Sequence, residues 1–351
     1  MKKQLSICLA AALLAGLLLG CAPADPPAAS AEAPTAAPAQ TAAPTPQAEE
    51  TAAAPAQEAE GDPVVYRTAD ISPEGLQAVY EALGAVLSAE NVAVKISTGE
   101  TGSNYLRPEL IGDLVASVHG TIVECNTAYG GQRANTAYHL QLAQDHGYTA
   151  IADVDILDAE GSLTLPVEGG AYLAENYVGA NLANYDYIVV LSHFKGHSMA
   201  GFGGAIKNIS IGIASSAGKA WIHSAGKTED TEKLWSSLPA QDDFLESMAE
   251  AAKAIAAHCG ERILYISVMN NLSVDCDCDA HPEPPRMGDI GILASLDPIA
   301  VDQACLDLVY ASDDPGRDHL VERIESLNGV RTVESAAALG FGTREYELVE
   351  L

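Results

Sequence analysis

Short apolar runs alternate with amphipathic stretches along the chain after residue 62. Five of these runs are rich in β-branched residues and show little polar alternation, which is typical of strands buried on both faces of a sheet; they cover residues 92–96, 121–125, 187–193, 263–269 and 290–295. The stretches between them have helical periodicity; they cover residues 73–87, 108–119, 134–146, 244–258 and 298–310. This alternation predicts one large α/β domain over residues 62–351, with a mixed, mostly parallel sheet flanked by helices.

The first 61 residues predict an export signal and a linker. "MKK" is followed by an apolar segment and by Cys21 directly after Gly20, which is the pattern of a processed signal and resembles a bacterial lipoprotein signal over residues 1–20. By that resemblance Cys21 is lipidated and anchors the protein to a membrane of the cell envelope, outside the cytoplasm. An uncleaved membrane anchor is the alternative. Residues 21–61 are Ala- and Pro-rich without apolar bulk, so we expect a disordered spacer.

The net charge of the chain limits the classes of molecule that it is expected to bind. The 351 residues include 18 Lys and Arg against 48 Asp and Glu, for a formal net charge of −30. Nucleic acid is therefore excluded as an expected partner. The few cations of such a chain are expected to serve local purposes.

Several of these bases gather in the stretch "SHFKGHSMAGFGGAIKN", residues 192–208. It follows the expected strand 187–193, and parallel sheets bind ligands beyond the carboxyl ends of their strands. Glycines there can present backbone N–H groups to an anion, and a helix starting near "GGAIKN" would add its positive dipole end. We expect His193, Lys195, His197 and Lys207 to complete a pocket for a small phosphate- or carboxylate-bearing ligand. The alternative is a tight turn with solvated lysines.

A second polar segment follows the strand at 121–125. It contains Asn126, Tyr129 and Arg133, and an arginine suits bidentate contact with carboxylate or phosphate. A helix start with a surface arginine is equally compatible. His139 and His146 are expected to be structural, and Asp297 before Pro298 is expected to cap a helix.

The segment "VDCDCDAH" places Cys276 and Cys278 two residues apart, beside several aspartates and His281. Three interpretations remain open: metal or cluster ligation, a disulfide or redox pair, and plain structural cysteines. The remaining cysteines of the domain lie in or beside apolar patterns and are expected to be buried thiols; they are Cys125, Cys259 and Cys305.

Five motifs in this order resemble the DUF362 family over roughly residues 90–310. They read "VKISTGE", "CNTAYGGQRANTAYHLQLAQDHG", "LSHFKGHSMAGFGGAIKNISIGIASSAGKAWIHS", "DCDC" and "DIGILASLDPIAVDQACLDLV". Members are often labelled iron–sulfur centre proteins, so the resemblance implies such a cluster. However, the ferredoxin-like module with its cysteines is absent here, and a [4Fe–4S] centre needs about four thiolates. Where the family typically has an acidic residue before "NT", this chain has Cys125.

The resemblance implies a core of site residues. His193, Lys195 and His197 are the expected catalytic residues, and Cys276, Cys278 and Asp289 the expected ligands of a divalent metal. The remaining core residues are expected to bind the anionic ligand; they are Lys95, Asn126, Tyr129, Arg133, Gly203, Gly204, Lys207, Asn208 and His223.

Two functions of different classes follow. The first is an enzyme or redox-linked protein that acts on a bound anion. The second is a non-catalytic extracytoplasmic lipoprotein that captures a small anion or metal. Turnover would distinguish them.

Overall fold

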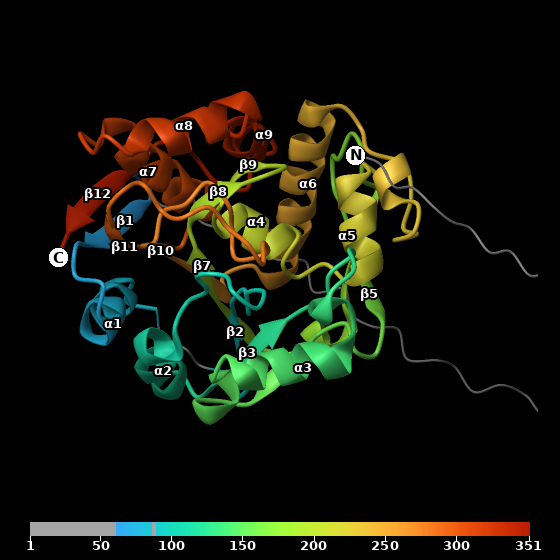
Figure 1. Cartoon of the computed structure of the whole chain (residues 1–351), viewed down its shortest axis with the longest axis horizontal. Helices are drawn as coiled ribbons and strands as arrows, with labels where there is room; N and C mark the ends of the chain where they lie inside the picture. Colours follow the sequence, from blue (N-terminus) through green and yellow to red (C-terminus); the bar gives the residue numbers. More distant parts are fainter. Residues whose placement is uncertain (1–60, 86–88) are drawn as a thin grey trace, which may run out of the picture. The chain divides into compact units, whose positions relative to one another are not determined.

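A computed structural model describes residues 61–85 and 89–351. Within this part of the chain, an eight-stranded sheet has the order β12-β1-β11-β10-β7-β2-β3-β4 (Figure 1). The predicted signal 1–20, the linker up to residue 60 and Cys21 lie outside the described residues. None of the described helices is both long enough and apolar enough to cross a bilayer.

The predicted mixed, mostly parallel sheet is confirmed. Strand β11 (Gly291–Ser295) is antiparallel to both of its neighbours, β1 (Val64–Thr68) and β10 (Ile263–Met269). The other five pairings are parallel; they join β12 (Glu347–Glu350) to β1, β10 to β7 (Tyr187–His193), β7 to β2 (Val92–Lys95), β2 to β3 (Gly120–Glu124) and β3 to β4 (Val154–Ile156). Four neighbouring parallel strands, β10, β7, β2 and β3, therefore end at one edge.

Helices cover both faces of the sheet. Successive residues of a strand point to opposite faces, so the apolar side chains of one strand contribute to two separate cores. In β7, Val189 and Leu191 pack in a core with helices α1 (Pro73–Ala82), α2 (Pro108–Ser117) and α3 (Thr136–Asp145). Ile188 and Val190 belong to the other core, which is built from helices α4 (Ala205–Ser210), α6 (Gln241–Cys259), α7 (Pro298–Ala311) and α9 (Arg331–Ala338). Both faces of β7 are thus apolar, which explains its uninterrupted apolar run.

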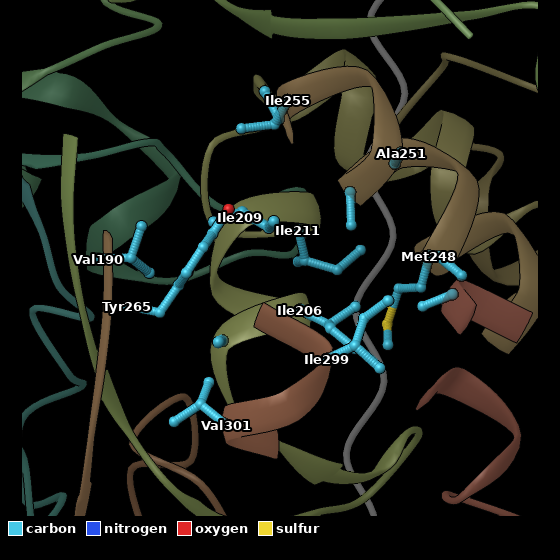
Figure 2. Packing of buried hydrophobic residues seen from close by; sticks show 14 of the residues in the cluster. Val190, Ile206, Ile209, Ile211, Met248, Ala251, Ile255, Tyr265, Ile299 and Val301 are labelled. Carbon is cyan, nitrogen blue, oxygen red and sulfur yellow. The ribbon is translucent and has the colours of Figure 1, made fainter. Parts of the chain in front are cut away.

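The short helix α4 lies within the second core. Figure 2 shows Ile206 and Ile209 of α4 among Met248 of α6, Ile299 of α7 and Tyr265 of β10. Six residues cannot form a stable helix alone, so this packing determines its position.

Asp302 of α7 fixes the start of α4. Its carboxylate accepts the N–H groups of Ala205, at 2.7 Å, and Ile206, at 2.9 Å. A Cβ on Gly204 would lie 2.2 Å from Asp302 Oδ1, so only glycine fits. The expectation that the first N–H groups of this helix would bind an anion is therefore wrong, because the buried carboxyl group of Asp302 already accepts them.

The stretch expected to be one loop also contains a small hairpin. Strand β8 (Lys195–His197) pairs with β9 (Gly201–Gly203). Gly196 allows close packing there, since a Cβ would lie 2.5 Å from the Val274 carbonyl oxygen. The hairpin packs against the segment that carries the cysteines, since the N–H of Gly196 donates to the Ser273 carbonyl. This segment also contacts the end of β7 through His193 and Asp277.

The remaining elements complete the domain. Strands β5 (Ser162–Pro166) and β6 (Glu175–Gly179) form a separate two-stranded sheet, and α5 (Ser216–His223) and α8 (Arg317–Ser326) are helices. Asp297 caps α7 as predicted, accepting the N–H groups of Ile299 and Ala300.

Candidate functional site

A cavity of about 470 Å³ lies at the carboxyl ends of the parallel strands. Lys95 ends β2, Glu124 ends β3 and His193 ends β7, while Cys276 and Cys278 lie in the segment that follows β10. Helices α4 and α5 supply Lys207, Asn208, Lys219 and His223 to its wall. These segments converge at one crevice, because the carboxyl ends of neighbouring parallel strands lie at the same edge of the sheet.

Twelve of the fifteen sequence-predicted residues line this cavity: Lys95, Tyr129, Arg133, His193, His197, Gly203, Gly204, Lys207, Asn208, His223, Cys276 and Cys278. Asn126 lies behind the wall, where its amide donates to Thr136 and its oxygen faces His139. Lys195 is buried beneath the cysteine segment. Asp289 is exposed and accepts the N–H of Asn271, so the structure does not bring it to the cysteines.

Arg133 is buried rather than a surface arginine, and each of its three side-chain nitrogens has a hydrogen-bond partner. Nε contacts Glu100 at 2.8 Å, Nη1 contacts Glu124 at 3.2 Å, and Nη2 donates to Tyr129 Oη at 3.0 Å. Burial alone would raise the pKa of Glu124, but Lys95 and Arg133 lower it to about 2. Arg133 therefore holds the carboxylates of the wall and has little left for a ligand.

Lys95 is occupied in the same way. Its ammonium contacts the Ile96 carbonyl at 2.6 Å, Asn208 Oδ1 at 3.0 Å and Glu124 Oε2 at 3.4 Å. Burial lowers the pKa of Lys95, while Glu124 acts in the opposite direction. Asn208 also donates to Ser192 Oγ, so it ties β2 and β7 to helix α4.

Lys207, which is half-buried, and Lys219, which is buried, differ from the buried cations Lys95 and Arg133. Among residues 61–85 and 89–351, neither has a carboxylate within 4.0 Å. Lys219 donates to the Ala214 carbonyl at 2.6 Å, whereas Lys207 has no hydrogen-bond acceptor in this part of the chain. Burial, together with the charge of Arg133, lowers the pKa of Lys207 to about 8, so it remains mostly protonated at neutral pH. Two cations without counter-ions thus face one cavity.

His193 is held at both ring nitrogens. Nδ1 lies 2.8 Å from Asp277 Oδ2, and Nε2 lies 3.0 Å from the Asn270 carbonyl. Lys195 contacts the other oxygen of Asp277 at 3.0 Å. Burial alone would raise the pKa of Asp277, but His193 and Lys195 lower it below its ordinary value. His193 and Lys195, both expected to be catalytic, are therefore engaged in anchoring Asp277.

Within the part of the chain that the structure describes, His197 and His223 each have one ring nitrogen without a hydrogen-bond partner. Nδ1 of His197 accepts the N–H groups of Met199 and Ala200, so its neutral ring carries the proton on Nε2. Nδ1 of His223 donates to the Lys219 carbonyl at 2.6 Å, which leaves Nε2 as an acceptor. Burial lowers the pKa of His197 well below its ordinary value and, with the nearby lysines, that of His223 to about 4.

The two cysteines of the wall form a disulfide, Cys276–Cys278. A ring nitrogen of His197 and the two sulfurs lie within 4.8 Å of one another, which makes these residues a candidate metal-binding group. Cys125, Cys259 and Cys305 are buried free thiols, as predicted. The described residues do not fit a [4Fe–4S] cluster, because they bring only two cysteine sulfurs together.

Two residues that line the cavity were not singled out from the sequence. Glu124 precedes Cys125 at the end of β3 and supplies the acid of that segment, so its place at a strand end was a usable signal. Lys219 lies four residues before His223 on α5, a spacing that places both side chains on one helix face.

The sequence of this chain matches a known protein family. The family model DUF362, described as a domain of unknown function, matches residues 92–307. No match was found among the curated proteins.

Two solved structures show weak likeness. The lactate racemase apoprotein from Thermoanaerobacterium thermosaccharolyticum is 16% identical with a TM-score of 0.36, and the match covers 58% of this chain and 50% of that one. The crystal structure of a protein from Thermotoga maritima is 13% identical with a TM-score of 0.36, over 76% of this chain and 58% of that one. The match thus covers less than two thirds of the length of each of these two solved proteins. With a TM-score of 0.36, neither one supports a conclusion about the activity of this chain. The family match includes the strand ends, α4, α5 and the cysteine segment, and the chain belongs to the DUF362 family.

Proposed function

We propose that the domain is an enzyme that binds a small anionic substrate in this cavity and catalyses a proton transfer to or from that substrate. The observation that carries the proposal is the pair of half-buried Lys207 and buried Lys219, which face the cavity and have no carboxylate within 4.0 Å among the described residues. An ammonium group without a carboxylate partner is costly to bury, and a bound carboxylate or phosphate would remove that cost. The volume of about 470 Å³ suits a small molecule.

His223 and His197 have the states that acid–base chemistry needs. Nε2 of His223 is a free acceptor and is the proposed base, while Nε2–H of His197 is a free donor for an oxygen that gains negative charge. A pKa of about 4 makes His223 a weak base in the free protein. An anion beside Lys207 and Lys219 would offset their charge and raise that pKa when the substrate is bound.

Anion binding can be tested by thermal shift and calorimetry, with inorganic phosphate and succinate as probes. We expect Lys207→Met and Lys219→Met each to weaken binding about 10- to 100-fold, since a hydrogen bond to a charged group contributes about 1.5–3 kcal/mol. Lys253→Met, on helix α6 and outside the cavity, makes the same charge change and is the matched control. Equal affinity in all four proteins would contradict the proposal.

Capture of a divalent metal is the second candidate, favoured by the grouping of His197, Cys276 and Cys278. It requires that the disulfide be reduced and that His197 move its ring proton, because Nδ1 now accepts two backbone N–H groups. Metal analysis of the reduced protein tests this. About one zinc per chain, lost in Cys276→Ser/Cys278→Ser, would support it.

Export and lipidation at Cys21 also remain a proposal, supported by the pattern of residues 1–21. We expect Cys21→Ala to abolish acylation while the domain stays folded. Retention of the variant in the membrane with its first twenty residues uncut would indicate a plain anchor instead.

A further inference from the structure

The Cys276–Cys278 disulfide lies at the wall of the cavity rather than in a core. Both cysteines are half-buried and line the cavity, whereas the three free thiols Cys125, Cys259 and Cys305 are buried, although Cys125 also borders the cavity. The bond closes a ring across a single residue, Asp277. Because the stabilisation by a disulfide grows with the logarithm of the length of the loop it closes, a bond across a single residue contributes little to the stability of the domain.

The residue between the two sulfurs is fixed without help from the disulfide. The Asp277 side chain contacts His193 at 2.8 Å and Lys195 at 3.0 Å, and its backbone carbonyl accepts the N–H of Glu100 at 2.8 Å. Two salt-bridging side chains and a backbone bond therefore hold this segment. Reduction of the disulfide would leave both thiols at the cavity wall.

The surroundings favour negative charge on sulfur. The N–H of Cys278 lies 3.2 Å from Cys276 Sγ, and a ring nitrogen of His197 lies within 4.8 Å of both sulfurs. Nδ1 of His197 already accepts two backbone N–H groups, so the neutral ring has its N–H donor at Nε2. Hydrogen-bond donors and nearby cations lower the pKa of a cysteine thiol and make it a better leaving group in exchange.

From these contacts we infer that Cys276 and Cys278 form a reversible dithiol–disulfide couple that exchanges electrons with a small anionic thiol bound in the cavity. The thiolate of the first thiol molecule attacks Cys278 Sγ, the S–S bond breaks, and Cys276 leaves as a thiolate stabilised by the Cys278 N–H. A second thiol molecule attacks the mixed disulfide, which releases Cys278 and the small-molecule disulfide. Two electrons pass from the thiols to the protein, and protons exchange with water. The preference for an anionic thiol rests on the proposed function; the exchange itself does not.

Exchange can be measured with the native full chain in glutathione buffers. After equilibration, alkylation and peptide mass spectrometry report the state of each cysteine. We expect Cys276 and Cys278 to be reduced in excess reduced glutathione and reoxidised in excess oxidised glutathione, while Cys125, Cys259 and Cys305 stay unalkylated. A pair that stays oxidised in excess reduced glutathione until denaturant is added would overturn the inference.

Thiol selectivity separates this inference from the proposed function. 2-Mercaptoethanesulfonate and cysteamine are similar in size but opposite in charge, and we expect the anionic thiol to reduce the pair at least about tenfold faster. Lys207→Met should remove that preference, and Lys253→Met should keep it. Reduction at equal rates by both thiols would contradict the anion cavity while still supporting the couple. No reduction by either thiol would contradict the couple.

Two variants test the assigned roles. Cys276→Ser should trap a mixed disulfide on Cys278 and Cys278→Ser should trap less on Cys276, because Cys278 is the attacked sulfur. His197→Asn keeps an acceptor for the Met199 and Ala200 N–H groups but removes the imidazole donor. A thiolate pKa raised by one unit would slow alkylation of reduced Cys276 about tenfold at neutral pH. An unchanged pH profile of alkylation would overturn the role of His197.

Discussion

His197 and His223 line the same cavity with their ring protons on opposite kinds of nitrogen. Nδ1 of His197 accepts two backbone N–H groups, at 3.1 and 2.9 Å, whereas Nδ1 of His223 donates to a carbonyl at 2.6 Å. Each state is imposed by a backbone group of the ring's own segment. We expect ¹⁵N NMR of the imidazole rings to show the Nε2–H form for His197 and the Nδ1–H form for His223. The same form in both rings would contradict the assigned acid and base.

Ligand binding should change the titration of His223. Its pKa of about 4 results from burial and from the positive charge of Lys207 and Lys219. Phosphate bound between the lysines would offset that charge, so the pKa of His223 should rise. The measurement is an NMR titration of the His223 ring with and without saturating phosphate, and Lys207→Met with Lys219→Met should abolish the difference. A pKa that phosphate does not move would place the anion elsewhere.

Loss of Arg133 should strongly destabilise the domain. Arg133→Met leaves the buried carboxylates of Glu100 and Glu124 short of their main cation, and breaking a buried ion pair from one side costs roughly 3–5 kcal/mol. The exposed pair of Arg286 with Glu283 provides the control, for which Arg286→Met should cost less than about 1 kcal/mol. Urea unfolding of both variants gives the comparison. Similar midpoints would mean that the wall does not depend on Arg133.

Substitution of Gly204 should be far more harmful than substitution of a nearby glycine. A methyl group on Gly204 would meet Asp302 Oδ1 at 2.2 Å, whereas a methyl group on Gly130, also at the cavity, would meet nothing within 4 Å. Gly204→Ala should therefore cost about 1–3 kcal/mol, the typical cost of overpacking, and Gly130→Ala should be nearly neutral. Thermal unfolding measures both. Equal melting temperatures would show that α4 can shift away from Asp302.

The domain should lose stability between pH 6.5 and 4 because of its buried histidines. Burial lowers the pKa of His139 to about 3 from an ordinary value near 6.5. The unfolded chain therefore binds a proton at this histidine in a range where the folded chain does not, and stability falls as the pH falls. At about 1.4 kcal/mol per pH unit, His139 alone accounts for roughly 3 kcal/mol between pH 6.5 and 4. Unfolding measured across this range should be less pH-dependent in His139→Gln.

The sheet was predictable because its strands are apolar on both faces. The runs at 187–193 and 263–269 coincide with β7 and β10 to the residue. Helix α3 was expected from residue 134 but begins at Thr136, because Asn135 caps it by accepting the N–H groups of Ala137 and Tyr138. Helix α8 was not predicted, because only Leu320 and Ile324 of its ten residues are buried.

The members of the site were predictable, but their partners were not. His193 was expected at a ligand site because it ends a predicted strand, and Lys95 because the family resemblance implied it. Nothing in the local sequence shows that Glu100 reaches Arg133, 33 residues away, or that Asp302 reaches the start of α4, nearly a hundred residues away. Those pairings depend on the tertiary arrangement of the sheet. They explain why groups that were expected to bind a ligand instead hold the cavity wall in place.

Strand order also bears on the route by which the cavity forms during folding. Strands β2 and β3 are separated by a single helical crossover, so Lys95 and Glu124 are closer along the chain than β10 is to β7 and can meet earlier. The cysteine segment follows β10, which pairs with β7 about 75 residues before it, and loop closure over longer separations is slower. A refolding chain should therefore bury the Lys95–Glu124 pair before it acquires the sulfur-bearing wall. Until the cysteine segment is in place, Cys276 and Cys278 would be exposed to oxidants in solution. A partner that reacts with the two thiols of the folding chain would have to do so before the wall forms.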